Sequence, residues 1–326
     1  MRVTISGSVS ENRLVPLPVI LGPTGSGKTD LSVCFARAVG GEIVNCDSVQ
    51  VYRGFDIGTA KISAAERQSI PHHLIDIVEP TRLFTAGDYA RAAEAAIREI
   101  SARKRMAVLV GGTGFYLRGL LDGLSPGPVR DDALRSRLLD RELKRPGSLH
   151  RILTRLDPDS ASRIHPNDEN KTLRALEVRL LEGSPLTSMF ERGRAALSGF
   201  MPVKIGLDPP RQLLYSRINE RARRMFYPDA PRESLVDEVR RLLAAGVPPE
   251  AKPFASLGYK QVLRMLQGQI TEEQALESTE QETRRYAKRQ QTWFRREHGV
   301  EWLAGFGDDP RVQTEALAIL RRAFAA

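Results

Sequence analysis

The sequence predicts an α/β fold, a parallel sheet flanked by helices, with an α-helical domain inserted into it. Two observations carry this prediction. Short apolar runs alternate with amphipathic stretches in the first half of the chain, and strand-like runs then vanish between residues 122 and 199. Such alternation is typical of parallel strands joined by crossover helices. We therefore assign residues 13–121 and 200–326 to the core and residues 122–199 to the helical insert.

The expected elements follow from local patterns. Short apolar runs, bounded by glycine or polar residues, predict strands at 18–21, 42–45, 106–110 and 203–207. Amphipathic periodicity predicts helices at about 28–39, 89–103 and 272–297, and a basic helix that ends near Phe226. In the insert, prolines break the chain into short helices: Pro126, Pro128, Pro146, Pro158, Pro166 and Pro185.

Composition narrows the class of protein. With 326 residues, 41% of them hydrophobic, the chain can bury a large core and carry an insert. It has no run of about 18 apolar residues and no apolar stretch of a signal peptide, so we expect a cytoplasmic protein without a membrane span. Cys34 and Cys46 lie outside any disulfide or zinc pattern. The net charge of +9 favours polyanionic partners such as nucleic acid, although many soluble proteins are as basic without one.

A phosphate-binding loop is predicted between the first strand and the first helix. The segment matches GxxxxGKT: Gly22, Pro23, Thr24, Gly25, Ser26, Gly27, Lys28 and Thr29. Its glycines let backbone N–H groups surround phosphate oxygens, Lys28 adds a full charge, and the Thr29 hydroxyl suits Mg²⁺. The alternative is a glycine-rich turn without a ligand, which the complete pattern in this context disfavours. A diphosphate of any alcohol presents the same group as a nucleotide, so the loop does not identify its ligand.

Two strand ends bear on the chemistry. The run 106–110 ends in Gly111-Gly112-Thr113-Gly114, without the acid that positions magnesium in many NTPases of this fold. Asp47 follows the second strand, where side chains of an open α/β sheet point into the ligand crevice. It is therefore placed to accept a proton from an attacking nucleophile. The alternative for Asp47 is the cap of a turn or helix.

Six segments in this order resemble the motifs of the tRNA dimethylallyltransferases, also called tRNA isopentenyltransferases: GPTGSGKT, DSVQVYRGFDIGTAK, GGTGFYLRGL, HPNDENKTLRALEV, SLGYKQ and TRRYAKRQQTWFR. The resemblance runs from about Val19 to Glu297. It implies a fold related to P-loop kinases in which dimethylallyl diphosphate, with Mg²⁺, replaces the nucleotide. Thr24 would lie near the departing oxygen, and Asp47 would be the general base.

The resemblance also implies the acceptor, the exocyclic N6 amine of the adenosine 3′ of the anticodon in tRNAs that read codons beginning with U. The insert would bind the anticodon stem-loop, and the protein would act as a monomer. The residues that would contact tRNA match family positions: Asp47, Ser48, Val49, Gln50, Thr113, Arg135, Ser256, Leu257, Gly258, Tyr259, Lys260 and Gln261. Three departures from the family pattern occur at Gly25, Lys171 and the segment 226–231.

Basic residues gather on two predicted helices. The longest helix carries Arg284, Arg285, Lys288, Arg289, Arg295 and Arg296, and an earlier one carries Arg217, Arg221, Arg223 and Arg224. We assign these side chains to RNA phosphates. Trp293 and Phe294 lie among them, but aromatics at helical spacing are usually buried, so we expect both in the core. His165, near a helix start of the insert, is expected to cap or pack because it lacks partners at zinc-ligand spacing.

Three other functions use some of the same features. An ATP-dependent small-molecule kinase would use the phosphate loop and Asp47 but leave the insert and the basic helix unexplained. A non-catalytic RNA-binding or nucleotide-switch protein would need a switch motif that the sequence lacks. Prenylation of free AMP or ADP would not require a surface for a polynucleotide. The sequence therefore favours tRNA prenylation.

Overall fold

The computed structural model describes residues 14–125, 127–191, 196–229 and 232–325. Its contacts divide the chain into two compact units, Met1–Leu121 with Leu197–Ala326, and Asp122–Ala196. The larger unit is the core and the smaller one is the insert. The chain rejoins the core at Leu197, slightly before the expected residue 200, because the Leu197 N–H donates to the Leu120 carbonyl oxygen at 3.1 Å. Pro126 and the first dozen residues lie outside the described residues.

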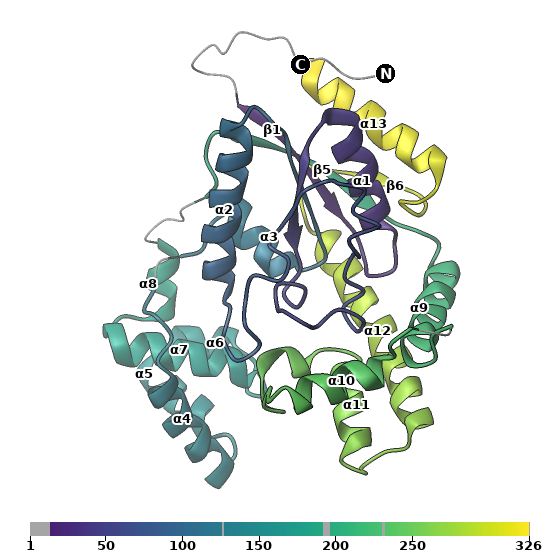
Figure 1. The fold of residues 1–326 in the computed structure, drawn as a ribbon. Helices are drawn as coiled ribbons and strands as arrows, with labels where there is room; N and C mark the ends of the chain where they lie inside the picture. Colours follow the sequence, from purple (N-terminus) through teal and green to yellow (C-terminus); the bar gives the residue numbers. More distant parts are fainter. Residues whose placement is uncertain (1–13, 126, 192–195, 230–231, 326) are drawn as a thin grey trace. The chain divides into compact units, whose positions relative to one another are not determined.

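The core contains a parallel sheet with strand order β3-β2-β4-β1-β5-β6 (Figure 1). Every pairing is parallel, and the register places Val19 of the central strand beside Leu109 on one side and Lys204 on the other. The prediction of a parallel α/β sheet is therefore confirmed, with β3 and β6 as two edge strands that lack a long apolar run. The strands are β1 (Val15–Leu21), β2 (Glu42–Cys46), β3 (His72–His73), β4 (Ala107–Gly111), β5 (Phe200–Leu207) and β6 (Val300–Leu303).

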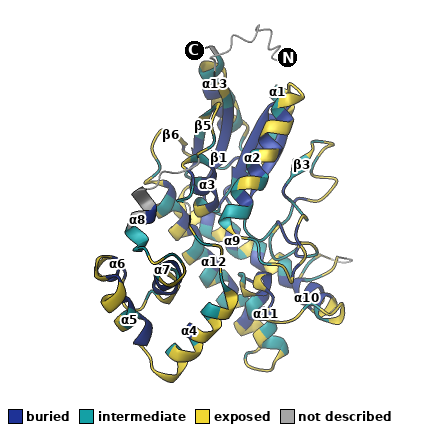
Figure 2. Cartoon of the chain, turned by 90° about the vertical axis from the view of Figure 1, so that its left-hand side faces the viewer, coloured by how far each residue is buried: buried dark blue, intermediate teal, exposed yellow. Residues whose placement is uncertain are grey.

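Helices cover both faces of the sheet because β1 alternates its side chains between them. Leu17, Val19 and Leu21 pack with α2 (Ala86–Ala102) and α3 (Gly114–Leu121), whereas Ile20 packs on the opposite face with α1 (Lys28–Val39) and α13 (Pro310–Ala325). Figure 2 shows most of β1 buried and an exposed stripe along α2. Helix α2 begins three residues earlier than expected, because the Thr85 side chain caps it in a capping box with Asp88.

Further helices of the core surround the carboxyl ends of the strands. They are α9 (Arg211–Phe226), α10 (Leu235–Ala244), the 3₁₀ helix η1 (Lys252–Ala255), α11 (Tyr259–Leu266) and α12 (Glu272–Phe294). A separate hydrophobic cluster joins α10, η1 and α11 to the segment after β2, through Val51, Tyr52 and Phe55. These helices therefore hold that segment against the functional site. Within the described residues, no helix combines the length and the apolar composition needed to cross a membrane.

The insert is helical, as predicted, and has its own hydrophobic cluster. Its helices are α4 (Asp132–Lys144), α5 (Ser148–Leu156), α6 (Pro158–Arg163), α7 (Glu169–Glu182) and α8 (Leu186–Glu191). Asp168 caps α7, and the His165 ring accepts from the Asn167 N–H at 3.1 Å, so His165 serves the turn before this helix. The fully buried Glu177 accepts two hydrogen bonds of 2.8 Å from Arg135.

Candidate active site

The phosphate loop connects β1 to α1, as its pattern predicts. Gly25 and Gly27 adopt φ values of +81° and +82°, a left-handed conformation that favours glycine. The loop closes on itself, because the Ser26 N–H and the Lys28 ammonium donate to the Pro23 carbonyl oxygen at 3.3 and 2.7 Å. The loop thus precedes the N-terminus of α1 with the geometry that binds phosphate groups.

The turn at residues 306–308, which follows β6, packs against the phosphate loop at Ser26 and Gly27. The Gly307 N–H donates to the Ser26 carbonyl oxygen at 2.9 Å, and a side chain at Gly27 would lie 2.7 Å from that nitrogen. Arg217 of α9 binds Asp308 of the same turn through two hydrogen bonds of 2.8 and 3.0 Å, and its guanidinium lies 3.9 Å from the centre of the Phe306 ring. Arg217, which we assigned to RNA, is therefore engaged in an ion pair beside the loop.

Two side chains that the sequence analysis did not assign to the phosphate site contact Thr24. Arg221 of α9 donates to the Thr24 hydroxyl at 2.7 Å. Gln290 of α12 accepts from the Thr24 N–H at 2.8 Å and donates to the Gly112 carbonyl oxygen, also at 2.8 Å. The only clue to Arg221 in the sequence is its place beside Ile218 and Ala222, which are the inward face of a predicted helix. Gln290 lies in the segment TRRYAKRQQTWFR, whose arginines and lysine predict a basic surface and give no sign of a role at the phosphate loop.

The phosphate end of the site carries two partly buried basic side chains, Lys28 and Arg221. Burial and the nearby Arg221 together lower the pKa of Lys28 to about 7, although the Asp47 carboxylate opposes both effects. Burial also lowers the pKa of Arg221, again opposed by Asp47. Within the described residues, neither cation forms a direct ion pair with a carboxylate. Two partly buried basic side chains without a carboxylate partner, beside a phosphate loop, favour a polyanionic ligand.

Asp47 lies directly after β2. One of its carboxylate oxygens accepts from the Val49 and Gln50 N–H groups at 2.8 and 3.2 Å, so the capping role considered as an alternative is present. That role uses only one oxygen and fixes the direction of the other. Thr113, after β4, accepts from the Ser48 N–H at 3.1 Å and ties the two strand ends together. The same carboxylate can therefore cap the turn and face the cavity.

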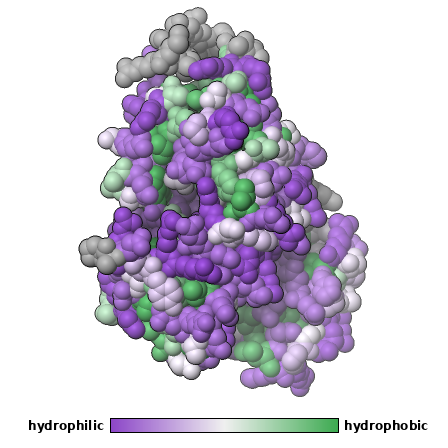
Figure 3. Space-filling view, turned by 90° about the vertical axis from the view of Figure 1, so that its right-hand side faces the viewer, coloured by the Kyte–Doolittle hydropathy of each residue, from purple (hydrophilic) through white to green (hydrophobic). Residues whose placement is uncertain are grey.

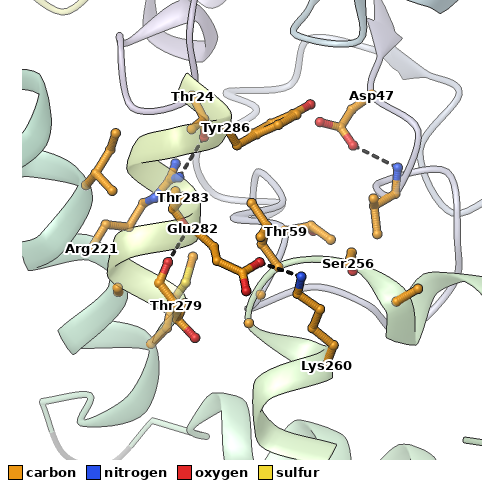
Figure 4. A pocket seen from close by; sticks show the side chains of 18 of the residues that line it. Thr24, Asp47, Thr59, Arg221, Ser256, Lys260, Thr279, Glu282, Thr283 and Tyr286 are labelled. Carbon is orange, nitrogen blue, oxygen red and sulfur yellow. Dashed lines mark hydrogen bonds and ion pairs between the residues drawn. The ribbon is translucent and has the colours of Figure 1, made fainter. Parts of the chain in front are cut away.

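Asp47 and Thr24 line one cavity of about 340 Å³ (Figure 4). The Tyr286 ring extends between them, while Arg221 lies on the side of Thr24. Burial and the charge of Asp47 both raise the pKa of Tyr286, so its hydroxyl stays protonated. The remaining lining residues come from the segment after β2, from helices α9, α11 and α12, and from the end of η1 with the turn before α11. They are Ser48, Val49, Gly58, Thr59, Ile218, Ala222, Met225, Ala255, Ser256, Leu257, Gly258, Lys260, Thr279, Glu282, Thr283 and Arg289.

Six residues expected to contact tRNA, 256–261, fall into two groups. Ser256, Leu257, Gly258 and Lys260 line the cavity, and Lys260 forms an ion pair with Glu282. In contrast, Tyr259 and Gln261 are 0% and 1% exposed and do not line it. Tyr259 packs in a hydrophobic cluster against Phe55, and the Gln261 side chain accepts from the Gly258 N–H at 2.9 Å. Their side chains therefore support the wall of the cavity from inside the protein.

The basic residues of α12 also differ from one another. Arg284 is bound to Asn219 and Glu280, and Arg295 binds Asp208 at 3.3 Å, whereas Arg285, Lys288 and Arg289 are exposed. Lys288 and Arg289 line a second, shallow depression together with Thr292, Trp293 and Arg296. Figure 3 shows mostly hydrophilic residues on the side of the core where α9 and α13 lie, with hydrophobic residues in smaller separate areas.

Trp293 and Phe294 of this helix pack as core residues, to different degrees. Phe294 is 1% exposed, which confirms the prediction that it belongs to the core. Trp293 is partly buried against the same hydrophobic cluster, and the Arg118 guanidinium lies 4.6 Å from the centre of its ring.

Arg135, which was also expected to contact tRNA, belongs to the insert. Its two hydrogen bonds to Glu177 occupy much of its guanidinium. A contact between Arg135 and tRNA remains a prediction.

Candidate metal ligands are few. Within the described residues, no three His, Cys, Asp or Glu side chains are grouped so that they could hold a metal ion. The Thr29 hydroxyl, exposed in the first turn of α1, lies beside the phosphate loop. It fits a hard cation that takes most of its oxygen ligands from a bound diphosphate and water.

Comparison with known proteins gives a consistent result. A family model described as IPP transferase matches residues 50–297. The chain is 54% identical to the tRNA dimethylallyltransferase of Solibacter usitatus, across 93% of this chain and 97% of the relative, and 52% identical to that of Koribacter versatilis, across 93% and 97%. A tRNA isopentenylpyrophosphate transferase from Bacillus halodurans is 37% identical, with a TM-score of 0.68 and coverage of 94% and 96%. A eukaryotic dimethylallyltransferase, described as acting on tRNA, is 27% identical with a TM-score of 0.79, across 95% and 80%.

Proposed function

Because the chain belongs to the IPP transferase family, we propose that it is a tRNA dimethylallyltransferase. It transfers a dimethylallyl group from dimethylallyl diphosphate to the N6 amine of the adenosine 3′ of the anticodon, in tRNAs that read codons beginning with U. One observation carries the proposal: Thr24 of the phosphate loop and the Asp47 carboxylate line a single cavity of about 340 Å³. That volume lies within the range typical of small-molecule sites.

The diphosphate binds at the loop end of the cavity. Backbone N–H groups of residues 25–29, the N-terminus of α1 and the Lys28 ammonium surround it. Arg221 approaches the same group through its hydrogen bond to the Thr24 hydroxyl, at 2.7 Å. Because Gln290 fixes the Thr24 backbone at 2.8 Å, Thr24 is held beside the oxygen that leaves. These donors are in place before charge develops and so stabilise the departing group.

The acceptor amine attacks from the Asp47 side. The adenine must leave its stack to enter the cavity, as bases do in other enzymes that modify them. The bond between N6 and C1 of the prenyl group forms, and the bond between C1 and the diphosphate oxygen breaks. Asp47 accepts the proton that N6 loses, because the amine is a weak nucleophile whose lone pair is delocalised into the ring. The products are N6-dimethylallyladenosine and diphosphate.

A divalent cation, which we take to be Mg²⁺, accompanies the diphosphate. The Thr29 hydroxyl is the protein ligand that the structure offers beside the loop. When bound, the ion neutralises negative charge that accumulates on the leaving diphosphate. The absence of a carboxylate after β4 distinguishes this site from that of a P-loop ATPase or kinase, because Gly111 and Gly112 occupy that strand end.

Nucleoside mass analysis tests the proposal. Purified protein with Mg²⁺ is incubated with unmodified tRNA that carries adenosine 3′ of the anticodon, and either dimethylallyl diphosphate or ATP is supplied. We expect adenosine to gain the mass of the prenyl group only with the prenyl donor. ATP consumption with a small-molecule acceptor, and no prenylated adenosine, would instead establish a kinase. Replacement of tRNA by AMP in a parallel reaction separates prenylation of free nucleotides from that of tRNA.

A further inference from the structure

The wall of the cavity beyond Asp47 consists of two segments, one after β2 and one before α11. Gly58 and Thr59 belong to the first, and the run 256–258 belongs to the second. Figure 4 shows Thr59 and Ser256 away from Arg221, toward the Asp47 side. Neither segment is held by a strand ladder at these residues. The first segment also contains Ala60 at a φ of +48°, a conformation that residues with a side chain rarely adopt. Surrounding contacts must therefore fix this wall.

A buried carboxylate on α10 supplies those contacts. Glu238 is 0% exposed, and one of its oxygens accepts from the Asp56 and Ile57 N–H groups at 3.1 and 2.8 Å. Its other oxygen accepts from the Tyr259 hydroxyl. The same hydroxyl accepts from the Gly58 N–H at 3.1 Å. Glu238 and Tyr259 together therefore accept hydrogen bonds from three consecutive backbone amides of the first segment. Tyr259 is also the first residue of α11, the helix that follows the second segment.

Packing around this pair is close. A Cβ at Gly58 would lie 2.3 Å from the Tyr259 ring, so only glycine lets the segment approach the ring this closely. The ring of Phe55 packs between Phe254 and Tyr259, with centroids at 5.0 and 4.8 Å. Leu235, one turn before Glu238, contacts the positions of both Gly58 and Gly258. The two wall segments thus share one support on α10.

We propose that Glu238 and Tyr259 are positioning residues that hold the acceptor end of the cavity in the shape that receives the adenine. This inference rests on the proposed function. Neither side chain lines the cavity, so both act through Gly58, Thr59 and the run 256–258. The diphosphate end is built by Thr24, Lys28 and Arg221, whose hydrogen bonds go to one another, to Pro23 and to Gln290. Loss of the pair therefore impairs use of tRNA and spares binding of the diphosphate.

Two conservative variants, Tyr259→Phe and Glu238→Gln, test this assignment. Each leaves buried hydrogen-bonding groups without a proper partner, and the imbalance is expected to lower kcat/KM for tRNA about tenfold. The KM for dimethylallyl diphosphate and the affinity for inorganic diphosphate should change less than twofold. Hydrogen–deuterium exchange of the amides of residues 56–58 should accelerate by about tenfold in both variants, because these amides donate to the pair.

Glu42→Gln is the matched control. Glu42 is also a buried carboxylate with several partners, namely His73 and Arg103, but it begins β2 at the end remote from Asp47. Its loss should lower the unfolding temperature and leave both kinetic constants unchanged. If the Glu238 variant fails to fold, Gly58→Ala tests the same contact from the other side, because the added methyl group displaces the segment from the Tyr259 ring.

The outcomes separate this inference from the proposed function. Wild-type protein that forms no prenylated adenosine would overturn the proposed function. Wild-type activity together with unchanged kcat/KM for tRNA in both variants would overturn only the positioning role. Equal losses of tRNA use and diphosphate binding would also overturn it, because they would indicate general damage to the site.

Discussion

Arg221 and Thr24 are joined by a hydrogen bond of 2.7 Å, which brings a guanidinium from α9 to the phosphate loop although 197 residues separate the two in sequence. Helix α9 is otherwise rich in exposed basic residues. The bond therefore sets Arg221 apart from its neighbours, because its charge faces the cavity while theirs face solvent or carboxylates.

Replacement of Arg221 by glutamine should raise the KM for dimethylallyl diphosphate by about 10- to 100-fold, because a charged hydrogen bond to the ligand is lost. Steady-state kinetics with saturating tRNA measures this change. Arg224→Gln is the control on the same helix, since Arg224 is exposed and pairs with Glu220. An unchanged KM in the Arg221 variant would exclude this residue from diphosphate binding.

Binding of diphosphate should be linked to proton uptake by Lys28. Burial lowers the pKa of this lysine to about 7, so at about pH 8 the free protein holds it mostly neutral, and a bound polyanion restores the proton. Calorimetry in buffers of different ionisation enthalpy should detect uptake at about pH 8 and less uptake at about pH 6. Lys28→Met should abolish the pH-dependent part. Equal uptake in this variant would assign the proton to another group.

The same shift affects stability in a defined direction. Without ligand, the folded protein releases the Lys28 proton near pH 7, whereas the unfolded chain keeps it until a pH near the ordinary value of 10.5. The unfolded state therefore binds more protons in this window, and the contribution of Lys28 to the free energy of unfolding rises with pH between these values. The pH dependence of chemical denaturation in wild type and Lys28→Met isolates this contribution.

Replacement of Asp47 by asparagine should lower kcat by about 100-fold or more, because general-base catalysis is lost. The amide oxygen can still accept from the Val49 and Gln50 N–H groups, so the local turn should persist. Affinities for tRNA and inorganic diphosphate should remain near those of the wild type. A rate equal to that of the wild type would remove Asp47 from the mechanism.

Charge reversal on α12 should weaken tRNA binding in a salt-dependent way. The structure identifies Arg285 and Lys288 as exposed, whereas Arg284 is held by Asn219 and Glu280. Arg285→Glu with Lys288→Glu should lower affinity and reduce the slope of log affinity against log salt by about 2. Arg311→Glu with Arg322→Glu on α13 is a charge-matched control. Unchanged affinity in the α12 variant would show that tRNA binds elsewhere.

Local patterns were sufficient to predict the parallel sheet, the helical insert, the glycine-rich turn between β1 and α1, and the place of Asp47 after β2. Each depends on residues close together in sequence, and GxxxxGKT between a strand and a helix fixes its own geometry. Arg221 and Gln290 could not be assigned to the phosphate site in this way, because the contacts that bring them to Thr24 span the whole core. The sequence shows that Arg221 is charged and that Gln290 is polar, but it does not show that both side chains point toward Thr24.

The run 256–261 illustrates the same limit at closer range. A motif marks all six positions alike, yet the first turn of α11 directs Tyr259 and Gln261 inward and Lys260 toward the cavity. Periodicity alone does not decide this, because the helix begins within the motif. The short edge strands β3 and β6 were missed for a related reason, since their pairing partners rather than their composition define them.

The hydrogen bond between Gly307 and Ser26 joins the phosphate loop to a segment that the ribosome synthesises much later. The ribosome makes the phosphate loop early, whereas α9, β6 and the turn at Gly307 emerge much later. A nascent chain thus carries a loop without its rear support and without Arg221. We therefore expect a chain that lacks these segments to bind diphosphate more weakly than the complete core does.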